Sequence, residues 1–294
     1  MFILYGDYTL GAWIFTKLRN FSAVKSSSVF DEANVSNKPL DPKVIEIVID
    51  DLKSEDRSRQ QDAFQLLSSL GRWIVPLLIE TIKRESNVRA RRLGTELIKS
   101  KGDDAVSMFR KSLMNESRPE YRARMLDVID SISTDLMVEL ADTLSDSADV
   151  VRRSAFRMAE RINTPEVIQL LLGLARADDP ELAAPAINSL GKLNVSAAVE
   201  TLIAVVEKSE EKVVVGAACR AMGQIADSLF VVPLEKLLLP KRRLLFQKKT
   251  ETAVRVAAVY AVSQIKDSRA AALLSALAED PDYRVREVLK NLRQ

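Results

Sequence analysis

Histidine is absent from this chain of 294 residues, and cysteine occurs only once, at Cys219. Without histidine the chain has neither the commonest general base nor the commonest metal ligand, and it cannot form a Ser–His or Cys–His nucleophile pair. A single cysteine also excludes an internal disulfide framework. Among the small residues of GAACRAMGQI it is predicted to be a buried packing thiol. We therefore expect no enzymatic activity, no catalytic residues, no metal and no cofactor.

Turn-forming and aromatic residues are scarce as well, with 9 Gly, 10 Pro and 5% aromatic residues. Hydrophobic residues make up 47% of the chain, and Ala, Leu, Val, Glu and Arg are abundant, which favours an all-helical protein. The net charge of +2 indicates no general preference for nucleic acid or membrane. The charges are nevertheless segregated, because residues 57–126 carry a net charge of +7, residues 127–211 of −9 and residues 212–294 of +7.

The first forty residues differ from the rest and are predicted to form an N-terminal segment followed by a linker. The stretch at 1–15 is apolar, but Asp7 interrupts it and no basic region precedes it, unlike a signal peptide or a membrane span. Residues 22–39 are rich in Ser and Asn, which is typical of linkers. We therefore expect no membrane span and a cytoplasmic location, which the single cysteine also favours.

From residue 41 onward the chain repeats a pair of helices. Residues 150–180 and 253–282 both begin with a β-branched residue and an arginine, continue as an Ala-rich amphipathic helix, break at a short polar turn and resume as a second apolar helix. An earlier unit starts near Arg57, and residues 41–52 are predicted to be the second helix of the unit before it. The other first helices are predicted to start at Val88, Tyr121, Val151, Leu182, Val213, Val254 and Val285.

The sequence VRVAAVYAVSQIKDSRAAALL at residues 254–274 resembles HEAT repeats, especially the short HEAT-like type of bacterial proteins and phycobilin lyases. The resemblance covers about residues 41–294. It implies an all-α fold, a right-handed α-solenoid of stacked antiparallel helix pairs of the HEAT and armadillo type, whose neighbouring units share one apolar core. A bilin groove stays open as an alternative. The iron ligands of HEAT-repeat hydroxylases include histidine, which the chain lacks.

One spacing, between Val213 and Val254, is about ten residues longer than the others. The surplus lies in LLLPKRRLLFQKKTETAVR (237–255), where Pro240 is expected to end a second helix. Insertions in repeat arrays often map to the binding face. The alternative is a long connection whose apolar residues pack on the solenoid while its bases stay solvated. We predict partner-binding residues in this insertion: Lys241, Arg242, Arg243, Phe246, Lys248 and Lys249.

A second basic cluster lies in KRESNVRARR, and phosphates would favour such a grouping. The alternative is structural: an arginine at the start of a first helix pairs with an acid of the preceding turn, and Arg152, Arg255 and Arg286 recur at comparable positions. The secondary basic patch is predicted to comprise Lys83, Arg84, Arg89, Arg91 and Arg92.

Together these patterns predict a non-enzymatic scaffold or adaptor. It would bind a protein partner of unknown identity through the concave solenoid surface or the 241–249 insertion. The alternative is a nucleic-acid-binding solenoid that uses the basic arms, residues 57–126 and 212–294. Small residues are expected where first helices approach one another closely, at Ala257 and Ala258.

Overall fold

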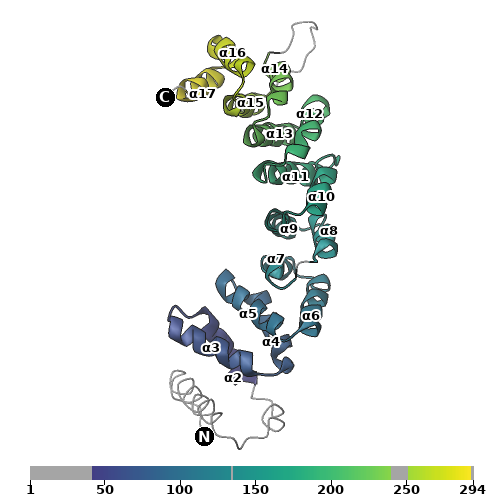
Figure 1. Ribbon diagram of the computed structural model, residues 1–294, viewed down its shortest axis with the longest axis vertical. Coiled ribbons are helices and arrows are strands. Elements are labelled where there is room, and N and C mark those ends of the chain that lie inside the picture. The colour runs from purple at the N-terminus through teal and green to yellow at the C-terminus, as the bar shows by residue number, and fades with distance from the viewer. Residues whose placement is uncertain (1–41, 134, 240–250, 293–294) are drawn as a thin grey trace, which may run out of the picture. The chain divides into compact units, whose positions relative to one another are not determined.

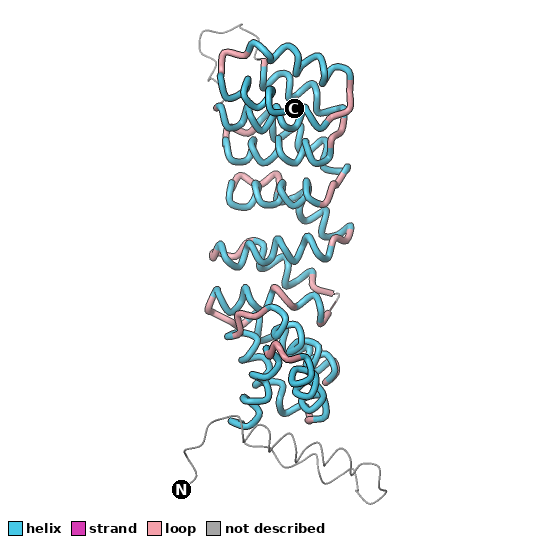
Figure 2. The backbone as a smooth tube through the Cα atoms, turned by 90° about the vertical axis from the view of Figure 1, so that its left-hand side faces the viewer, coloured by secondary structure: helices cyan, strands magenta, loops and turns pink. Residues whose placement is uncertain are grey.

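The computed structural model describes residues 42–133, 135–239 and 251–292. All regular secondary structure within these ranges is helical, which confirms the predicted all-α class (Figure 2). The predicted N-terminal segment and linker, residues 1–40, lie outside the described ranges. No helix of the described ranges combines the length and the apolar character that crossing a membrane requires.

The chain divides into two compact units, residues 1–139 and 140–294, and helix α8 (Met137–Leu144) crosses the division. Local sequence signals start the helices of unit 1. Asp56 and Asn87 precede α3 and α5, and their side chains accept hydrogen bonds from the first turns of these helices. Besides α8, the α-helices described in unit 1 are α2 (Pro42–Asp50), α3 (Arg57–Ser69), α4 (Val75–Arg84), α5 (Val88–Ser100), α6 (Asp103–Met114) and α7 (Pro119–Leu126). Its 3-10 helices are η1 (Asp51–Lys53), η2 (Arg72–Ile74) and η3 (Ile129–Ser131).

Unit 2 alternates first and second helices in two rows (Figure 1). Its first helices are α9 (Asp149–Ile162), α11 (Pro180–Lys192), α13 (Lys212–Ile225), α15 (Thr252–Gln264) and α17 (Tyr283–Leu292). Its second helices are α10 (Pro165–Leu174), α12 (Val199–Lys208), α14 (Val231–Leu238) and α16 (Ser268–Ala276), with 3-10 helices η4 (Ser196–Ala198), η5 (Ser228–Phe230) and η6 (Leu277–Glu279). The first helices α11, α13 and α15 each pack on the second helix that precedes them in the chain and on the next first helix. The predicted stacking of antiparallel helix pairs is therefore confirmed.

An arginine near the start of α5 ties one helix pair of unit 1 to the next. The Arg91 guanidinium donates to the backbone carbonyls of Glu85 and Ser86, both at 2.9 Å, and lies 3.2 Å from the Asp127 carboxylate. The carbonyls belong to the turn before α5, whereas the acid lies about one repeat further along the chain. Because Arg91 is buried, these contacts satisfy a charge that would otherwise be costly to desolvate.

Arg152 at the start of α9 has the same set of partners in unit 2. Its guanidinium donates to the carbonyls of Asp146 and Ser147, at 2.9 and 3.0 Å, and to the Glu181 carboxylate of the next repeat at 2.5 Å. Arg286 likewise donates to the carbonyl six residues before it. We call Arg91, Arg152 and Arg286 the anchor arginines. They use backbone carbonyls in the preceding turn, and Arg152 also lies 3.7 Å from the Asp149 carboxylate, an acid of the kind that the sequence predicted.

Helix α5 begins at Val88, as predicted. Its buried arginine is Arg91 rather than Arg89, however, and Ala90 takes the buried position before it. Val88 is 46% exposed. Val213 is 65% exposed, and Val214 is buried in its place. Only this register puts a guanidinium against the carbonyls of the preceding turn, and the sequence alone could not choose between two arginines two residues apart.

Small residues lie where neighbouring first helices of unit 2 meet. A Cβ on Gly191 in α11 would lie 2.7 Å from the Ala221 Cα of α13, and a Cβ on Gly223 would lie 3.0 Å from the Ala261 Cα of α15. Ala258 is fully buried, as predicted, whereas Ala257 is half-buried. The close approach of α13 and α15 therefore involves Ala261, one turn beyond the predicted pair.

Candidate functional site

The predicted partner-binding insertion falls on Lys241, Arg242, Arg243, Phe246, Lys248 and Lys249, which lie outside the described residues. The structure describes the chain up to Leu239, which follows α14, and again from Glu251.

The predicted secondary basic patch is divided between buried and exposed side chains. Lys83 is buried, with its ammonium 2.8 Å from Glu80 and 3.1 Å from Glu116. Arg91 is buried as an anchor arginine. The remaining members of the cluster are exposed on α4 and α5: Arg84, Arg89 and Arg92. The five side chains therefore do not form one continuous surface.

Within unit 1, Glu116 forms an ion pair with Lys83 of this cluster. Its carboxylate accepts from the Arg118 side chain at 2.8 and 3.0 Å and lies 3.1 Å from the Lys83 ammonium. The hydrogen bonds from Arg118, together with Lys83, lower the pKa of Glu116 to about 2. The carboxylate is therefore ionised at neutral pH. It pairs with two cations of the basic segment 57–126, Lys83 and Arg118.

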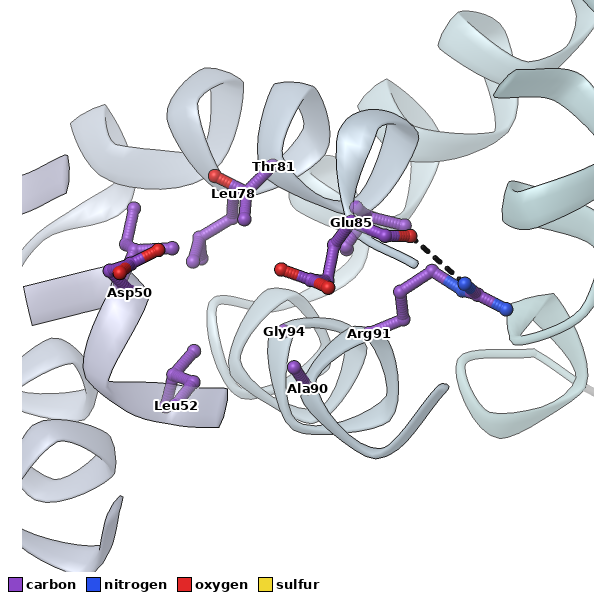
Figure 3. Close-up of a pocket in the computed structure, with 10 residues that line it drawn as sticks. Asp50, Leu52, Leu78, Thr81, Glu85, Ala90, Arg91 and Gly94 are labelled. Carbon is purple, nitrogen blue, oxygen red and sulfur yellow. Dashed lines mark hydrogen bonds between the residues drawn. The ribbon is translucent and has the colours of Figure 1, made fainter. Parts of the chain in front are cut away.

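A small cavity in unit 1 lies between α2, α4 and α5 (Figure 3). Figure 3 places Asp50 across the cavity from Glu85, whose backbone carbonyl accepts from Arg91. The cavity volume is about 20 Å³, enough for one or two waters. It is too small to hold an organic ligand.

The first helices of unit 2 can be aligned on the residues that end them. Asn163 after α9, Asn194 after α11 and Ala226 after α13 all have left-handed backbone, with φ of 47°, 52° and 55°. Counting back from these residues aligns three positions of α9 with the later helices. Arg153 corresponds to Ala184 and Gly216, Ser154 to Pro185 and Ala217, and Arg157 to Asn188 and Arg220. At the first of these three positions, the long arginine side chain of α9 is replaced by a methyl group on α11 and by a hydrogen atom on α13.

An open groove of about 750 Å³ is lined by four of these aligned residues, Ala184, Pro185, Asn188 and Arg220, whereas Gly216 is buried and does not line it. It crosses α9, α11 and α13, which are consecutive first helices of unit 2 (Figure 1). Ala184 and Pro185 contribute apolar lining, and Val213 adds an exposed apolar side chain from α13. Asn188 and Arg220 line it with polar groups. The sequence contained the signal for this groove, but it lies in small residues at equivalent repeat positions and in no charged motif.

The acids of the groove are already paired. Glu181 lies 2.5 Å from Arg152, and the Asp149 carboxylate lies 2.9 Å from Arg153. Arg220 differs, because its guanidinium forms no hydrogen bond or ion pair within the described part of the chain. A Cβ on Gly216 would lie 3.6 Å from Arg220 Nη1, which places that guanidinium over the glycine. The groove therefore presents a cation with no partner of its own.

Pro185 adds a backbone group to the groove. It lies inside α11 and has no N–H to give to the carbonyl of Glu181, four residues earlier. Both residues line the groove. Asn188, one turn further along, is half-buried and forms no side-chain hydrogen bond with the described residues. A ligand in the groove would thus meet a carbonyl acceptor and an amide that can donate and accept.

Cys219 is fully buried in α13, as predicted. Burial raises the pKa of its thiol to about 12, so the reactive thiolate is not populated at neutral pH. Across the described residues, no cluster of three carboxylate or thiol side chains has the spacing to hold a metal ion.

Two protein-family descriptions match the chain. Residues 172–245, which include α11 and α13 of the groove, match HEAT repeats, and residues 254–280 match the PBS lyase HEAT-like repeat. Both matches confirm the predicted HEAT repeats within these two ranges. No curated protein sequence matches it significantly.

Several solved structures are similar in fold. Human deoxyhypusine hydroxylase in complex with glycerol is 14% identical over 86% of this chain and 95% of that one, with a TM-score of 0.37. The protein YIBA_ECOLI is 12% identical over 99% and 98%, with a TM-score of 0.43. Kap121p bound to RanGTP is 13% identical over 86% of this chain and 32% of that one, with a TM-score of 0.49. At such identities and TM-scores these likenesses support no inference about function.

Proposed function

We propose that this HEAT-repeat protein is a non-enzymatic scaffold or adaptor whose partner is another protein, bound in the groove across α9, α11 and α13. The observation that carries the proposal is the groove itself, which opens where Ala184 on α11 replaces the long side chain of Arg153 on α9. A cytoplasmic location is part of the proposal, since a chain with one buried thiol needs no oxidising compartment to fold.

The chemistry of the groove favours protein over nucleic acid. A nucleic-acid site is dominated by cations that reach phosphates. Here two carboxylates, of Asp149 and Glu181, line the groove beside apolar residues, and only Arg220 is an unpaired cation. In unit 1, the cations of Lys83 and Arg91 are buried against internal partners, which also weakens the nucleic-acid alternative.

Filling the groove tests this proposal. Gly216→Glu adds a side chain where a Cβ meets nothing closer than 3.6 Å, and it places a carboxylate four residues before Arg220, a spacing that favours a helix ion pair. We expect the full-length variant to stay folded and to lose protein partners that the wild-type chain captures. Gly216→Ala adds only the Cβ and should keep them. Equal capture by wild type and Gly216→Glu would contradict the proposal.

The 241–249 insertion is a second proposed contact with the partner, on the basis of its sequence. A full-length chain in which Lys241, Arg242, Arg243, Lys248 and Lys249 are neutralised tests it separately. Reduced capture by this variant, with an unchanged melting temperature, would support a binding role, because surface charge changes alter stability by only about 0.5 kcal/mol. Unchanged capture would make the insertion a connection only.

A further inference from the structure

We infer that the occupant of the groove is an extended peptide segment of the partner, in which an acidic side chain lies close to an apolar one. This inference rests on the proposed function and makes it more specific. It follows from three properties of the groove: one unpaired cation, an apolar floor of small side chains, and hydrogen-bonding groups of the backbone type.

The charges of the groove select an acidic side chain. Because Arg152 and Arg153 already neutralise Glu181 and Asp149, a basic ligand would have to compete with internal ion pairs. Arg220 has no such internal partner, and an arginine guanidinium pairs with a carboxylate in a two-pronged geometry. A carboxylate bound here would pair with Arg220, which is the one charged residue among the described groove residues that has no ion-pair partner.

The floor of the groove selects an apolar neighbour. The small side chains of Ala184 and Pro185 form an apolar hollow in the groove on α11. Val213, 65% exposed at the start of α13, borders the same hollow. An apolar side chain placed here would remove both surfaces from water, and a well-packed anchor of this kind carries much of the affinity of a peptide.

The hydrogen-bonding groups select an extended backbone. The carbonyl of Glu181, which Pro185 cannot satisfy, accepts a peptide N–H, and the amide of Asn188 can pair with both a peptide N–H and a carbonyl. Packed helices lie about 8–10 Å apart. An extended chain advances about 3.3 Å per residue, so about three residues cross from α11 to α13. An apolar residue over the hollow and a carboxylate at Arg220 fit within that length.

A selection experiment tests the inference. The probe is a display library of random twelve-residue peptides, selected on the immobilised full-length chain and then synthesised. We expect enrichment of Asp or Glu within about three residues of a large apolar residue. Arg220→Gln should weaken binding of a selected peptide about tenfold to hundredfold, since it removes a charged hydrogen-bonding group. Arg269→Gln, at an exposed arginine on α16, is the matched control and should leave the dissociation constant unchanged.

Three outcomes would overturn the inference: enrichment of basic peptides, an unchanged dissociation constant for Arg220→Gln, or displacement of the selected peptide by a short single-stranded DNA. These three outcomes differ from the result that would contradict the proposed function, which is equal capture of protein partners by wild type and Gly216→Glu. If Gly216→Glu abolishes capture of protein partners while acidic peptides fail to bind, the scaffold function stands and the nature of the occupant is wrong. If Gly216→Glu leaves capture intact, the groove itself is wrong.

Discussion

Two first helices, α5 in unit 1 and α13 in unit 2, show that basic sequence and available positive charge are different properties. The segment around α5 contains five basic residues within 83–92, yet Lys83 and Arg91 are buried against internal acids or carbonyls. Helix α13 contains Arg220 and Lys212; Lys212 pairs with Glu251 at 2.8 Å, whereas Arg220 is unpaired within the described chain. Helix α13 therefore has fewer cations than α5, but one of them, Arg220, is better placed to bind a ligand.

The largest effect that separates these helices should come from removing the anchor arginine of α5. Arg91→Met removes the guanidinium that donates to the two carbonyls of the preceding turn and to the Asp127 carboxylate. Breaking a buried ion pair in this way costs about 3–5 kcal/mol. Arg89→Met, two residues earlier on the exposed side of α5, should change the free energy of unfolding by less than about 0.5 kcal/mol. Urea unfolding of both variants measures the difference, and similar unfolding midpoints would show that the register of α5 is wrong.

The next effect depends on pH and concerns the acid that engages Lys83. Because the pKa of Glu116 is lowered to about 2 in the folded state, its stabilising contribution is complete above the ordinary value of 4.5 and is lost as the pH falls toward 2. The loss should amount to about 3 kcal/mol. Glu116→Gln should be less stable at neutral pH and show a flatter loss between pH 4.5 and 2. Parallel pH profiles for the two proteins would contradict the internal pairing.

A smaller effect should distinguish two glycines of unit 2. Gly191→Ala puts a Cβ 2.7 Å from the backbone of Ala221, and overpacking of this kind costs about 1–3 kcal/mol. Gly216→Ala meets ordinary contact distances and should be neutral or stabilise α13 by up to about 1 kcal/mol. Thermal unfolding tests the pair. A Gly216→Ala variant as unstable as Gly191→Ala would contradict the open space that the structure shows beside Gly216.

The smallest effect on stability is expected at Arg220. Since its guanidinium has no partner in the described chain, Arg220→Gln should change the free energy of unfolding by less than about 0.5 kcal/mol. A loss of more than 1 kcal/mol would assign Arg220 an internal structural role and remove the cation from the proposed site. The measurement is again denaturant unfolding, made beside wild type.

The repeat pattern predicted the all-helical stack because apolar spacing, polar breaks and small residues all recur with one period. It did not predict the register of α5, since Arg89 and Arg91 both fit the pattern and only the folded turn supplies the carbonyls that choose between them. The groove was missed for a different reason. It opens where Ala184 has only a small side chain, whereas a search for chemistry in a sequence looks for reactive or charged groups.

The most direct test of the central claim is site-specific photo-crosslinking of the full-length chain. A photoreactive residue at Val213, 65% exposed and lining the groove, is compared with one at Leu229, 62% exposed in η5 and outside the groove lining. If the groove binds the partner, Val213 should cross-link to a discrete protein, Gly216→Glu should suppress the product, and Leu229 should give none. Equal products from both positions, or a product from Leu229 alone, would contradict the groove as the binding site.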